Sequence, residues 1–501
     1  MSCGNPEGAV EGEEKEEVLM PTSRPVRRVD KAICNRCKKA KTSFIFRQGA
    51  YCSPCYEISL RSRFIRQLHP PLRPGAVKST LTLYRPVVQS GQALIAVSGG
   101  AGSVAMLDML MSRGYISRSD GAATNRTKGQ KEAVWDKATV VYVEFASVTG
   151  RDERTEDIRK LSEDRGLGFI GLKVEDVYDA GLVSWLGGSE RNADTSGVKV
   201  NFQQPNLPVS QEPTTSNTTP VERLQSLLAS LPPASRPSLL SHILDHLLTL
   251  AALTLPNVSQ LLLGETATRL AQRVISGTAL GRGWTLPLEL SNSFTLPDSQ
   301  IVRMKPMKEI SVKEAALWCR IHGLETVNYR GWDDVGPKGK EGRAKGGAAS
   351  LEALTEQFIA GLSTTHPSTV STINRTGDKL VFPGDTSGPI CPLCEMPTEP
   401  DAMRWKARTA LTSLTDPHSS LGSPTIAGIH TGDSTHDNFA PTLCYACLTT
   451  LSGGATDRTT GDGMVNLPPW VGQRVSTSQR MVAREQMREE IADFLLATEE
   501  E

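Results

Sequence analysis

The stretch that most constrains the fold lies at Ala93–Leu107, where a short apolar run meets a glycine-rich turn and then resumes with helical spacing. Leu94–Val97 predicts a buried strand. Glycines let the backbone approach an anion closely, and a helix that begins at about Val104 would direct its N-terminus at that anion. The stretch therefore predicts a strand, a phosphate-type loop and a helix. The loop residues are Ser98, Gly99, Gly100, Ala101, Gly102 and Ser103.

Apolar strands alternate with helical patterns from Gly91 to about residue 330. Such alternation implies right-handed crossovers and a parallel sheet covered on both faces, so the predicted class is α/β. Further strands are expected at 138–145, 168–174, 258–263 and, edge-like, 300–304, and helices at 156–165, 232–255, 265–276 and 311–321.

The chain has 501 residues, too many for one core of ordinary size. Its hydrophobic fraction of 38% and aromatic fraction of 5% are low, which predicts substantial disordered sequence. The expected order is a disordered tail at 1–30, an N-terminal zinc module at 31–75, an α/β domain at 85–330 with linker insertions at 117–129 and 187–220, a linker and helix at 331–387, a C-terminal zinc module at 388–450 and a C-terminal helix at 466–501.

Neither the first twenty residues nor the most apolar run of the chain predicts a membrane segment. The first twenty residues are rich in glutamate and are not a secretory signal, and the leucine-rich run at 243–255 is too short and too polar to span a bilayer. We therefore expect a soluble protein of the cytoplasm. In a reducing compartment, paired cysteines indicate metal binding before disulfides.

Eight of the ten cysteines form four CxxC pairs. Fourteen residues separate the first two pairs, the spacing of a zinc ribbon or treble clef, which predicts one zinc site made by Cys34, Cys37, Cys52 and Cys55. Forty-nine residues separate the other two pairs, but the cost of closing a loop grows only logarithmically with its length. A second zinc site is therefore predicted from Cys391, Cys394, Cys444 and Cys447. Iron–sulfur ligation is the alternative for both sites, although short knuckles favour zinc.

Positive charge is concentrated near the N-terminus, although the net charge of the chain is zero. The segment Arg24–Arg73 holds thirteen lysines or arginines against Asp30 and Glu57, with four aromatic residues interleaved. An ordinary solvated face would explain scattered cations, but this density around a zinc module favours backbone and shape contacts with RNA. The candidate RNA-binding residues are Arg36, Lys38, Lys39, Lys41, Arg47, Arg61, Arg63 and Arg66.

In their order, the zinc module, glycine loop, α/β domain and second CxxC module resemble the cytosolic tRNA 2-thiolation enzymes (Ctu/Ncs family), of the PP-loop ATPase superfamily. The resemblance covers most of residues 31–450 and implies a HUP-like parallel sheet. The loop Ser98–Ser103 resembles the family's SGGxDS motif, but Gly102 stands where active members carry an acid. Met304–Met307 resembles the family's KPL strand end.

Two further features of active family members are missing. The segment Leu263–Arg269 keeps the glycine of a GHxxDD-like motif but has Thr268 and Arg269 in place of the acids. Active members also use mid-domain cysteines to handle sulfur, and between Cys55 and Cys391 this chain has only Cys319, which we expect to be a core thiol. The resemblance therefore implies a non-catalytic subunit with a degenerate phosphate loop.

The family's activity supplies the expected partners. The resemblance implies a heterodimer with a catalytic PP-loop subunit, which binds the ATP and thiolates the wobble uridine (U34) of tRNAs for Lys, Glu and Gln. The sulfur would come from a thiocarboxylated ubiquitin-related modifier, which would also connect the chain with protein urmylation. Two alternatives stay open: an active ATP-dependent RNA-modifying enzyme that uses another acid, such as Asp108 or Glu144, and a zinc-based RNA-binding adaptor.

Overall fold

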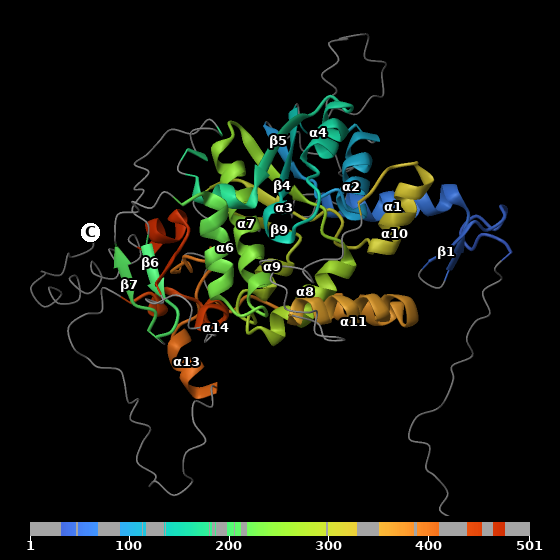
Figure 1. The fold of residues 1–501 in the computed structure, drawn as a ribbon. Coiled ribbons are helices and arrows are strands. Elements are labelled where there is room, and N and C mark those ends of the chain that lie inside the picture. The colour runs from blue at the N-terminus through green and yellow to red at the C-terminus, as the bar shows by residue number, and fades with distance from the viewer. Residues whose placement is uncertain are drawn as a thin grey trace, which may run out of the picture. The chain divides into compact units, whose positions relative to one another are not determined.

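The structure is a computed structural model, and it forms two compact units, one ending at Ile58 and the other beginning at Ser59 (Figure 1). The predicted tail, the linker at 117–129 and the part of the C-terminal helix after residue 475 lie outside the residues described. Those described are 32–46, 49–68, 91–112, 114–116, 135, 137–179, 181–182, 186, 198–204, 206–211, 218–296, 299–327, 350–384, 388–409, 438–452 and 464–475.

The first unit is a small hairpin followed by the start of a helix, whose remaining residues belong to the second unit. Strands β1 (Phe44–Phe46) and β2 (Gly49–Tyr51) pair antiparallel, and α1 (Ser53–Leu68) begins directly after them. The buried ring of Tyr56 packs against the rings of Phe44 and Phe46, with centroids 5.7 and 5.0 Å away. The aromatic residues interleaved with the N-terminal cations therefore form the small core of this unit.

The second unit is built on a six-stranded sheet in the order β5-β4-β3-β8-β10-β9. All neighbouring strands pair parallel except β9, which pairs antiparallel with β10 at one edge. The α/β class and the parallel sheet are thus confirmed, but the strand expected at an edge, β10, lies inside it. The strands are β3 (Gln92–Ala96), β4 (Lys137–Glu144), β5 (Gly168–Lys173), β8 (Val258–Leu263), β9 (Ser293–Thr295) and β10 (Val302–Met304).

Buried residues on both faces of β3 show that the sheet is covered on both sides. Leu94 belongs to the large core cluster that includes helix α7, and its neighbours Ala93 and Ile95, which point the other way, are also fully buried. Helix α2 is apolar on nearly every side, as expected of a helix enclosed by neighbours. The helices that follow the strands are α2 (Ala101–Ser112), α3 (Ala146–Thr149), α4 (Thr155–Glu163), α6 (Pro220–Ser230), α7 (Arg236–Thr254), α8 (Ala267–Ala279), α9 (Leu286–Leu290) and α10 (Val312–Ile321), with a 3-10 turn, η1 (Val174–Tyr178).

The strand order reverses between β3 and β8, because the chain runs outward from β3 to β5 and then returns to β8 and β10. In open α/β sheets, ligands bind beyond the carboxyl ends of the strands at this reversal. The loop Ser98–Gly100 follows β3, and Gly264–Thr266 follows β8. The fold therefore brings the two motif-bearing loops together.

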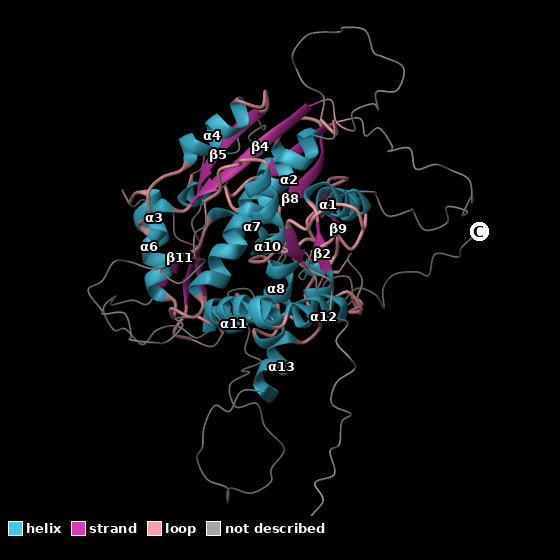
Figure 2. Cartoon of the chain, turned by 90° about the vertical axis from the view of Figure 1, so that its right-hand side faces the viewer, coloured by secondary structure: helices cyan, strands magenta, loops and turns pink. Residues whose placement is uncertain are grey.

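A second sheet corrects the predicted linker at 187–220. Residues of that segment form β6 (Val198–Asn201) and β7 (Val209–Gln211), which Figure 1 labels. They join β11 (Met464–Asn466), labelled in Figure 2, in the antiparallel order β11-β6-β7. The polar composition concealed strands of three and four residues, which are too short to show alternation. The predicted linker and helix at 331–387 likewise contains two helices, α11 (Leu351–Thr365) and α12 (Pro367–Gly377).

The C-terminal cysteine region does not flank the α/β domain as a separate module. Its buried residues Cys391, Phe439 and Leu451 belong to the same core cluster as Leu94 and Ile243. Its elements are α13 (Ala402–Thr409), η4 (Ala440–Thr442) and α14 (Tyr445–Ser452), and residues 469–475 are helical. None of the helices in the described ranges is long and apolar enough to cross a bilayer.

Candidate functional site

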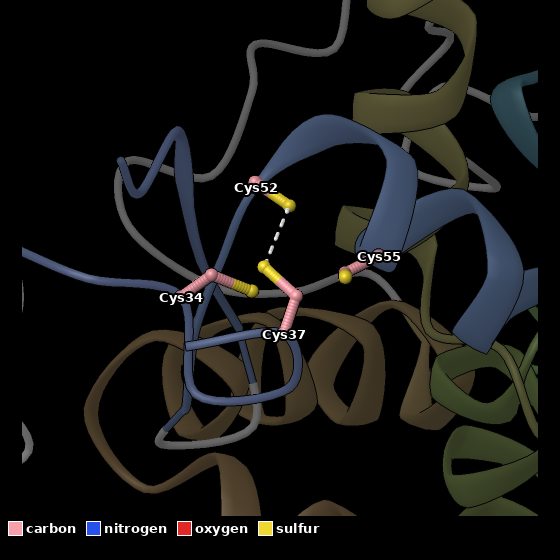
Figure 3. A group of neighbouring side chains, drawn as sticks. All are labelled: Cys34, Cys37, Cys52 and Cys55. Carbon is pink, nitrogen blue, oxygen red and sulfur yellow. Dashed lines mark hydrogen bonds between the residues drawn. The ribbon is translucent and has the colours of Figure 1, made fainter. Parts of the chain in front are cut away.

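The structure brings the eight paired cysteines together as two groups of four, as predicted. In each group the four Sγ atoms lie within 4.8 Å of one another. The first group is drawn in Figure 3, where all four side chains converge on one point. Its members are Cys34, Cys37, Cys52 and Cys55, and those of the second group are Cys391, Cys394, Cys444 and Cys447.

Each group combines a knuckle with the start of a helix. In the first, the N–H of Lys38 donates to Cys34 O at 2.8 Å, and Lys38 itself has a φ of 54°. In the second, the N–H of Glu395 donates to Cys391 O at 2.9 Å, with a φ of 59°. The other CxxC pair opens α1 in one case and α14 in the other. A knuckle followed by a helix that carries the second CxxC pair favours the treble clef over the ribbon for the first group.

The donor geometry fits one metal ion in each group. Four thiolates held tetrahedrally about 2.3 Å from a metal lie about 3.8 Å apart. Cys37 and Cys52 Sγ are 3.9 Å apart, and Cys394 and Cys444 Sγ are 3.7 Å apart. Burial opposes ionisation of Cys34, but hydrogen bonds from the backbone N–H groups of Cys37, Cys52 and Arg36 outweigh it and lower its pKa to about 6. Both groups can therefore hold a metal ion.

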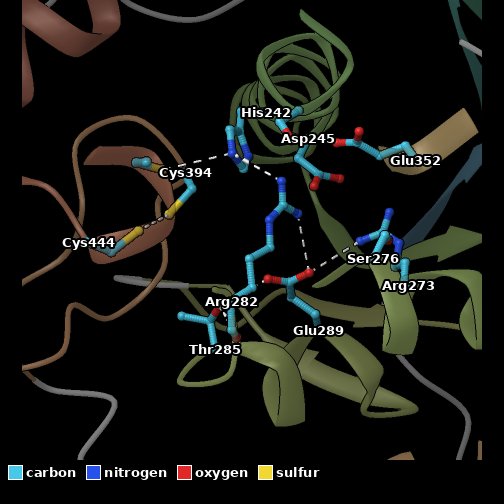
Figure 4. A network of polar contacts seen from close by, with 12 residues as sticks. His242, Asp245, Arg273, Ser276, Arg282, Thr285, Glu289, Glu352, Cys394 and Cys444 are labelled. Carbon is cyan, nitrogen blue, oxygen red and sulfur yellow. Dashed lines mark hydrogen bonds and ion pairs between the residues drawn. The ribbon is translucent and has the colours of Figure 1, made fainter. Parts of the chain in front are cut away.

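A buried charged network adjoins the second group (Figure 4). His242 Nε2 lies 3.8 Å from Cys447 Sγ and 3.4 Å from Arg282 Nη2. Because a guanidinium only donates hydrogen bonds, Nε2 accepts from Arg282 and the ring proton lies on Nδ1. Burial, assisted by the charge of Arg282, lowers the pKa of His242 to about 3, so this histidine is neutral. Arg282 Nη1 is also paired with Glu289 Oε2 at 3.6 Å.

Glu395 ties the knuckle of the second group to two distant segments. Its Oε1 lies 2.9 Å from His246 Nδ1 on α7 and 2.8 Å from Arg474 Nη2 in the helical residues 469–475. The ring of His246 stacks on Trp470 from the same segment, with centroids 4.3 Å apart. Burial opposes ionisation of Glu395, but His246 and Arg474 lower its pKa overall. Three parts of the chain are thus fixed at this centre.

The phosphate-type loop after β3 is occupied by contacts within the protein. Ser103 Oγ accepts a hydrogen bond from Ser98 N at 3.2 Å and donates to Gly100 O at 3.1 Å. Gly99 has a φ of 78°, and its carbonyl oxygen accepts a hydrogen bond from Val327 N at 2.9 Å.

Gly102, which stands at the position of the family's acid, has no room for a side chain. A Cβ atom there would lie 2.6 Å from Gly264 O and 2.8 Å from Thr266 Cγ2. A Cβ on Gly264 would in turn lie 2.5 Å from Ser103 Cα. The loops after β3 and β8 thus meet backbone to backbone at the point where the strand order reverses.

Charges beside this contact neutralise one another. Glu265 Oε1 lies 2.6 Å from Arg273 Nη2, and its Oε2 lies 2.7 Å from Lys305 Nζ. Burial opposes ionisation of Glu265, but Arg273 and Lys305 hold its pKa well below the usual range. At the degenerate acid positions, Thr268 Oγ1 accepts a hydrogen bond from the backbone of α10, and Arg269 pairs with Glu356 at 3.8 Å. The lysine of the strand-end motif therefore binds a carboxylate of its own chain.

The other residues considered for chemistry have structural partners. Cys319 is buried, its Sγ contacts Ala101 O at 3.6 Å, and burial and Asp108 raise its pKa to about 11. Asp108 accepts a hydrogen bond from Trp318 Nε1 at 2.9 Å. The carboxylate of the buried Glu144 accepts hydrogen bonds from the backbone N–H groups of residues 145, 146 and 154 and from the hydroxyl of residue 142.

The candidate RNA-binding cations fall into two groups. Four are exposed in the first unit, namely Arg36, Lys38, Lys39 and Lys41. Arg63 is buried and paired with Glu314 at 2.9 Å, so its prediction as an RNA contact is wrong. Arg66 pairs with Glu309 at 3.1 Å, and the guanidinium of Arg61 lies 5.1 Å from the centroid of Trp318. Arg47 lies outside the described residues. Sequence reasoning missed the network around Arg282, since its members are far apart in the chain.

Comparisons with known proteins point to one family. The family model described as cytoplasmic tRNA 2-thiolation protein 2 matches residues 350–449, which hold α11 and the second cysteine group. A curated relative of that name from Bos taurus is 24% identical over 93% of this chain and 93% of its own length, and one from Danio rerio is 25% identical over 93% and 95%. A Mus musculus relative is 28% identical over 58% of this chain and 56% of its own length.

A search of solved structures found the U34-tRNA thiolase NcsA from Methanococcus maripaludis with its 4Fe–4S cluster. That chain has a TM-score of 0.43 and 13% identity to this one, over 77% of this chain and 99% of the other. At this level the likeness carries no weight for the fold or the site. The sequence relatives do carry weight, because two of them match 93% of this chain. The chain is thus similar, over almost its whole length, to proteins named cytoplasmic tRNA 2-thiolation protein 2, and its residues 350–449 match the model of that family.

Proposed function

We propose that this chain is the non-catalytic subunit of a cytoplasmic heterodimer that 2-thiolates the wobble uridine of tRNAs for Lys, Glu and Gln. The observation that carries the proposal is the contact at Gly102. Active members of the resembled family place an acid at this position, whereas here a Cβ atom would lie 2.6 Å from the carbonyl of Gly264. The partner subunit would bind ATP and activate the uridine, since this loop offers no acid to hold magnesium.

The two cysteine groups would serve as structural zinc sites. A single ion with four thiolates produces sulfur separations near the 3.9 and 3.7 Å seen here. The cysteines of an iron–sulfur cube each bind a different iron and stand farther apart, so the geometry favours zinc. With all four thiolates on the metal, such a site is closed and contributes to folding rather than to sulfur transfer. The sulfur would come from a thiocarboxylated ubiquitin-related modifier and be transferred on the catalytic subunit.

The exposed cations of the first unit support an RNA contact. Arg36, Lys38, Lys39 and Lys41 lie on or next to the first knuckle, where they can reach phosphates without reading bases. An adaptor without a role in thiolation would have the same surface, so it stays a second candidate. The active-enzyme alternative loses support, because Asp108 and Glu144 are held by structural hydrogen bonds.

The test is the amount of wobble 2-thiouridine in tRNA from cells that lack this chain. Deletion should abolish it, and the purified chain should thiolate tRNA only together with the catalytic subunit, ATP and the sulfur donor. Re-expression of Gly102→Asp should not yield a chain that works alone. Normal 2-thiouridine in the deletion, or thiolation by the isolated chain, would refute the proposal. Normal thiolation with intact RNA binding would favour the adaptor.

A further inference from the structure

Helix α13 carries an exposed tryptophan among cations. Its sequence is AMRWKART, which contains Arg404, Lys406 and Arg408 and no acid. Trp405 is 59% exposed and is the largest of the exposed apolar side chains in the described ranges. Tryptophan is enriched at binding surfaces, where its flat ring supplies a large contact area.

The position of α13 is fixed by the second cysteine group. Ala402 is buried and Met403 packs against the large core cluster, whereas Trp405 is exposed and does not belong to that cluster. The ring of Trp405 lies edge-on to that of Tyr445, with centroids 6.2 Å apart and planes at 73°. Tyr445 stands between Cys444 and Cys447, and its N–H donates to the carboxylate of Glu399, just before α13. Figure 1 shows α13 beside α14, which begins at Tyr445.

The charge around the exposed ring indicates what it binds. Phe358 on α11 is exposed to a similar extent, 54%. The two residues before it are the half-buried Glu356 and the exposed Gln357, neither of which is a cation. Trp405 instead lies between the exposed Arg404 and the half-buried Lys406. An aromatic ring flanked by cations suits a polyanion that also presents flat rings. Single-stranded RNA has both, since each base offers a face for stacking and each linkage a phosphate.

We propose that α13 binds unpaired nucleotides of the tRNA substrate, with one base stacked on Trp405 and the neighbouring phosphates held by Arg404 and Lys406. The identity of the RNA rests on the proposed function, whereas the site itself rests on the surface of α13. The site belongs to the second unit, whereas the exposed cations around the first cysteine group belong to the first. The second metal centre would then serve to hold a base-stacking residue in place.

The test measures the dissociation constant of the full chain for an unmodified tRNA transcript, alone and with the catalytic subunit. Trp405→Ala should raise the dissociation constant by about tenfold, because stacking of one base is worth that order of affinity, and should leave the salt dependence unchanged. Arg404→Ala should have a smaller effect and lower the salt slope by about one. Trp405→Phe, which keeps a stacking ring, should retain most of the affinity.

Phe358→Ala is the matched control, since it removes an exposed aromatic side chain from a helix without flanking cations. It should leave the dissociation constant unchanged, and metal content should be the same in all four variants. Affinity of Trp405→Ala within twofold of wild type, or no tRNA binding by the wild-type complex, would overturn the inference. So would weaker binding of the catalytic subunit with unchanged RNA affinity, which would make α13 a protein contact. The proposed function fails on a different result, normal 2-thiouridine in cells without the chain.

Discussion

The two cysteine groups have the same local geometry but different surroundings. In the first, the cysteines form a small cluster of their own with Tyr51, within a unit that ends at Ile58. In the second, Cys391, Cys444 and Cys447 belong to the core cluster that also contains the sheet and α7. One knuckle is followed by a basic, exposed Lys38, the other by Glu395, which binds α7 and the last helical segment.

This difference indicates that the same ligand motif can have two roles in folding. A metal that organises a few dozen residues stabilises only those residues. A metal in the shared core stabilises the sheet as well, because losing it would leave polar thiol groups unligated within the core cluster that the sheet shares. We therefore expect the second centre, and not the first, to control the stability of the α/β unit.

The largest effect that tests this comparison is expected from Cys444→Ser. The variant should lose one equivalent of metal out of two, and the free energy of unfolding of the main transition should fall by several kcal/mol, on the order expected for a structural metal site. Cys52→Ser, the matched variant in the first group, should also lose one equivalent but leave the main transition unchanged. Metal quantification and thermal unfolding check both. If the two variants lowered the free energy of unfolding equally, the second group would not control the stability of the α/β unit more than the first.

Sequence patterns identified the ligands of both centres and most of the sheet, because CxxC spacing and apolar strands are local signals. They did not show that the second group shares the core of the sheet, because the leucine-rich sequence of α7 predicts a buried helix but not which segments pack against it. The prediction that Arg63 contacts RNA was wrong because its partner, Glu314, lies 251 residues away and could not be identified from the sequence. Strand β9, with three residues, is too short to give a pattern.

A smaller effect is expected from Glu265→Gln, which acts on the second unit without touching a ligand. The change leaves the buried Lys305 without its paired carboxylate and removes one of the two carboxylates paired with the half-buried Arg273, and breaking a buried pair costs about 3–5 kcal/mol. The folded-state pKa of Glu265 is below its ordinary value of 4.5, so its stabilising contribution is complete above about that pH and is lost as the pH falls through the lowered value. The gap between wild type and variant should therefore narrow only in acid.

The exposed pair of Arg66 and Glu309 provides the control for that experiment. Glu309→Gln should cost less than about 1 kcal/mol, because surface pairs contribute little. Urea unfolding of both variants at several pH values gives the comparison. If both substitutions lowered the free energy of unfolding by the same small amount, the buried charges around Glu265 would not stabilise the loop after β8.

Gly102→Ala should separate the stability of the second unit from its metal content. The added methyl group would lie 2.6 Å from Gly264 O, and such overpacking costs about 1–3 kcal/mol. Both equivalents of metal should remain bound, because the loop shares no ligand with either cysteine group. Gly283→Ala provides the control, since Gly283 also lies in the second unit, has no positive φ, as is true of Gly102, and has open space around its Cβ position. Loss of metal from Gly102→Ala would mean that metal binding at the second cysteine group depends on the contact between the loops after β3 and β8.

The smallest effect concerns Arg282, which connects the charged network to the second centre. Burial lowers the pKa of Arg282, but Glu289 and the thiolates of Cys447 and Cys394 outweigh it and raise the value overall, so the guanidinium faces the thiolates as a cation. A metal with four thiolates carries net negative charge, which this cation offsets. Arg282→Met, which keeps most of the volume, should therefore weaken metal binding at the second centre by about tenfold, the lower end for residues that support ligands. Competition with a chelator should release the second equivalent earlier than in wild type, while the first, at Cys34–Cys55, keeps its affinity and reports that the chain is folded. If both metal equivalents were released as in wild type, Arg282 would not be the residue that offsets the negative charge of the second centre.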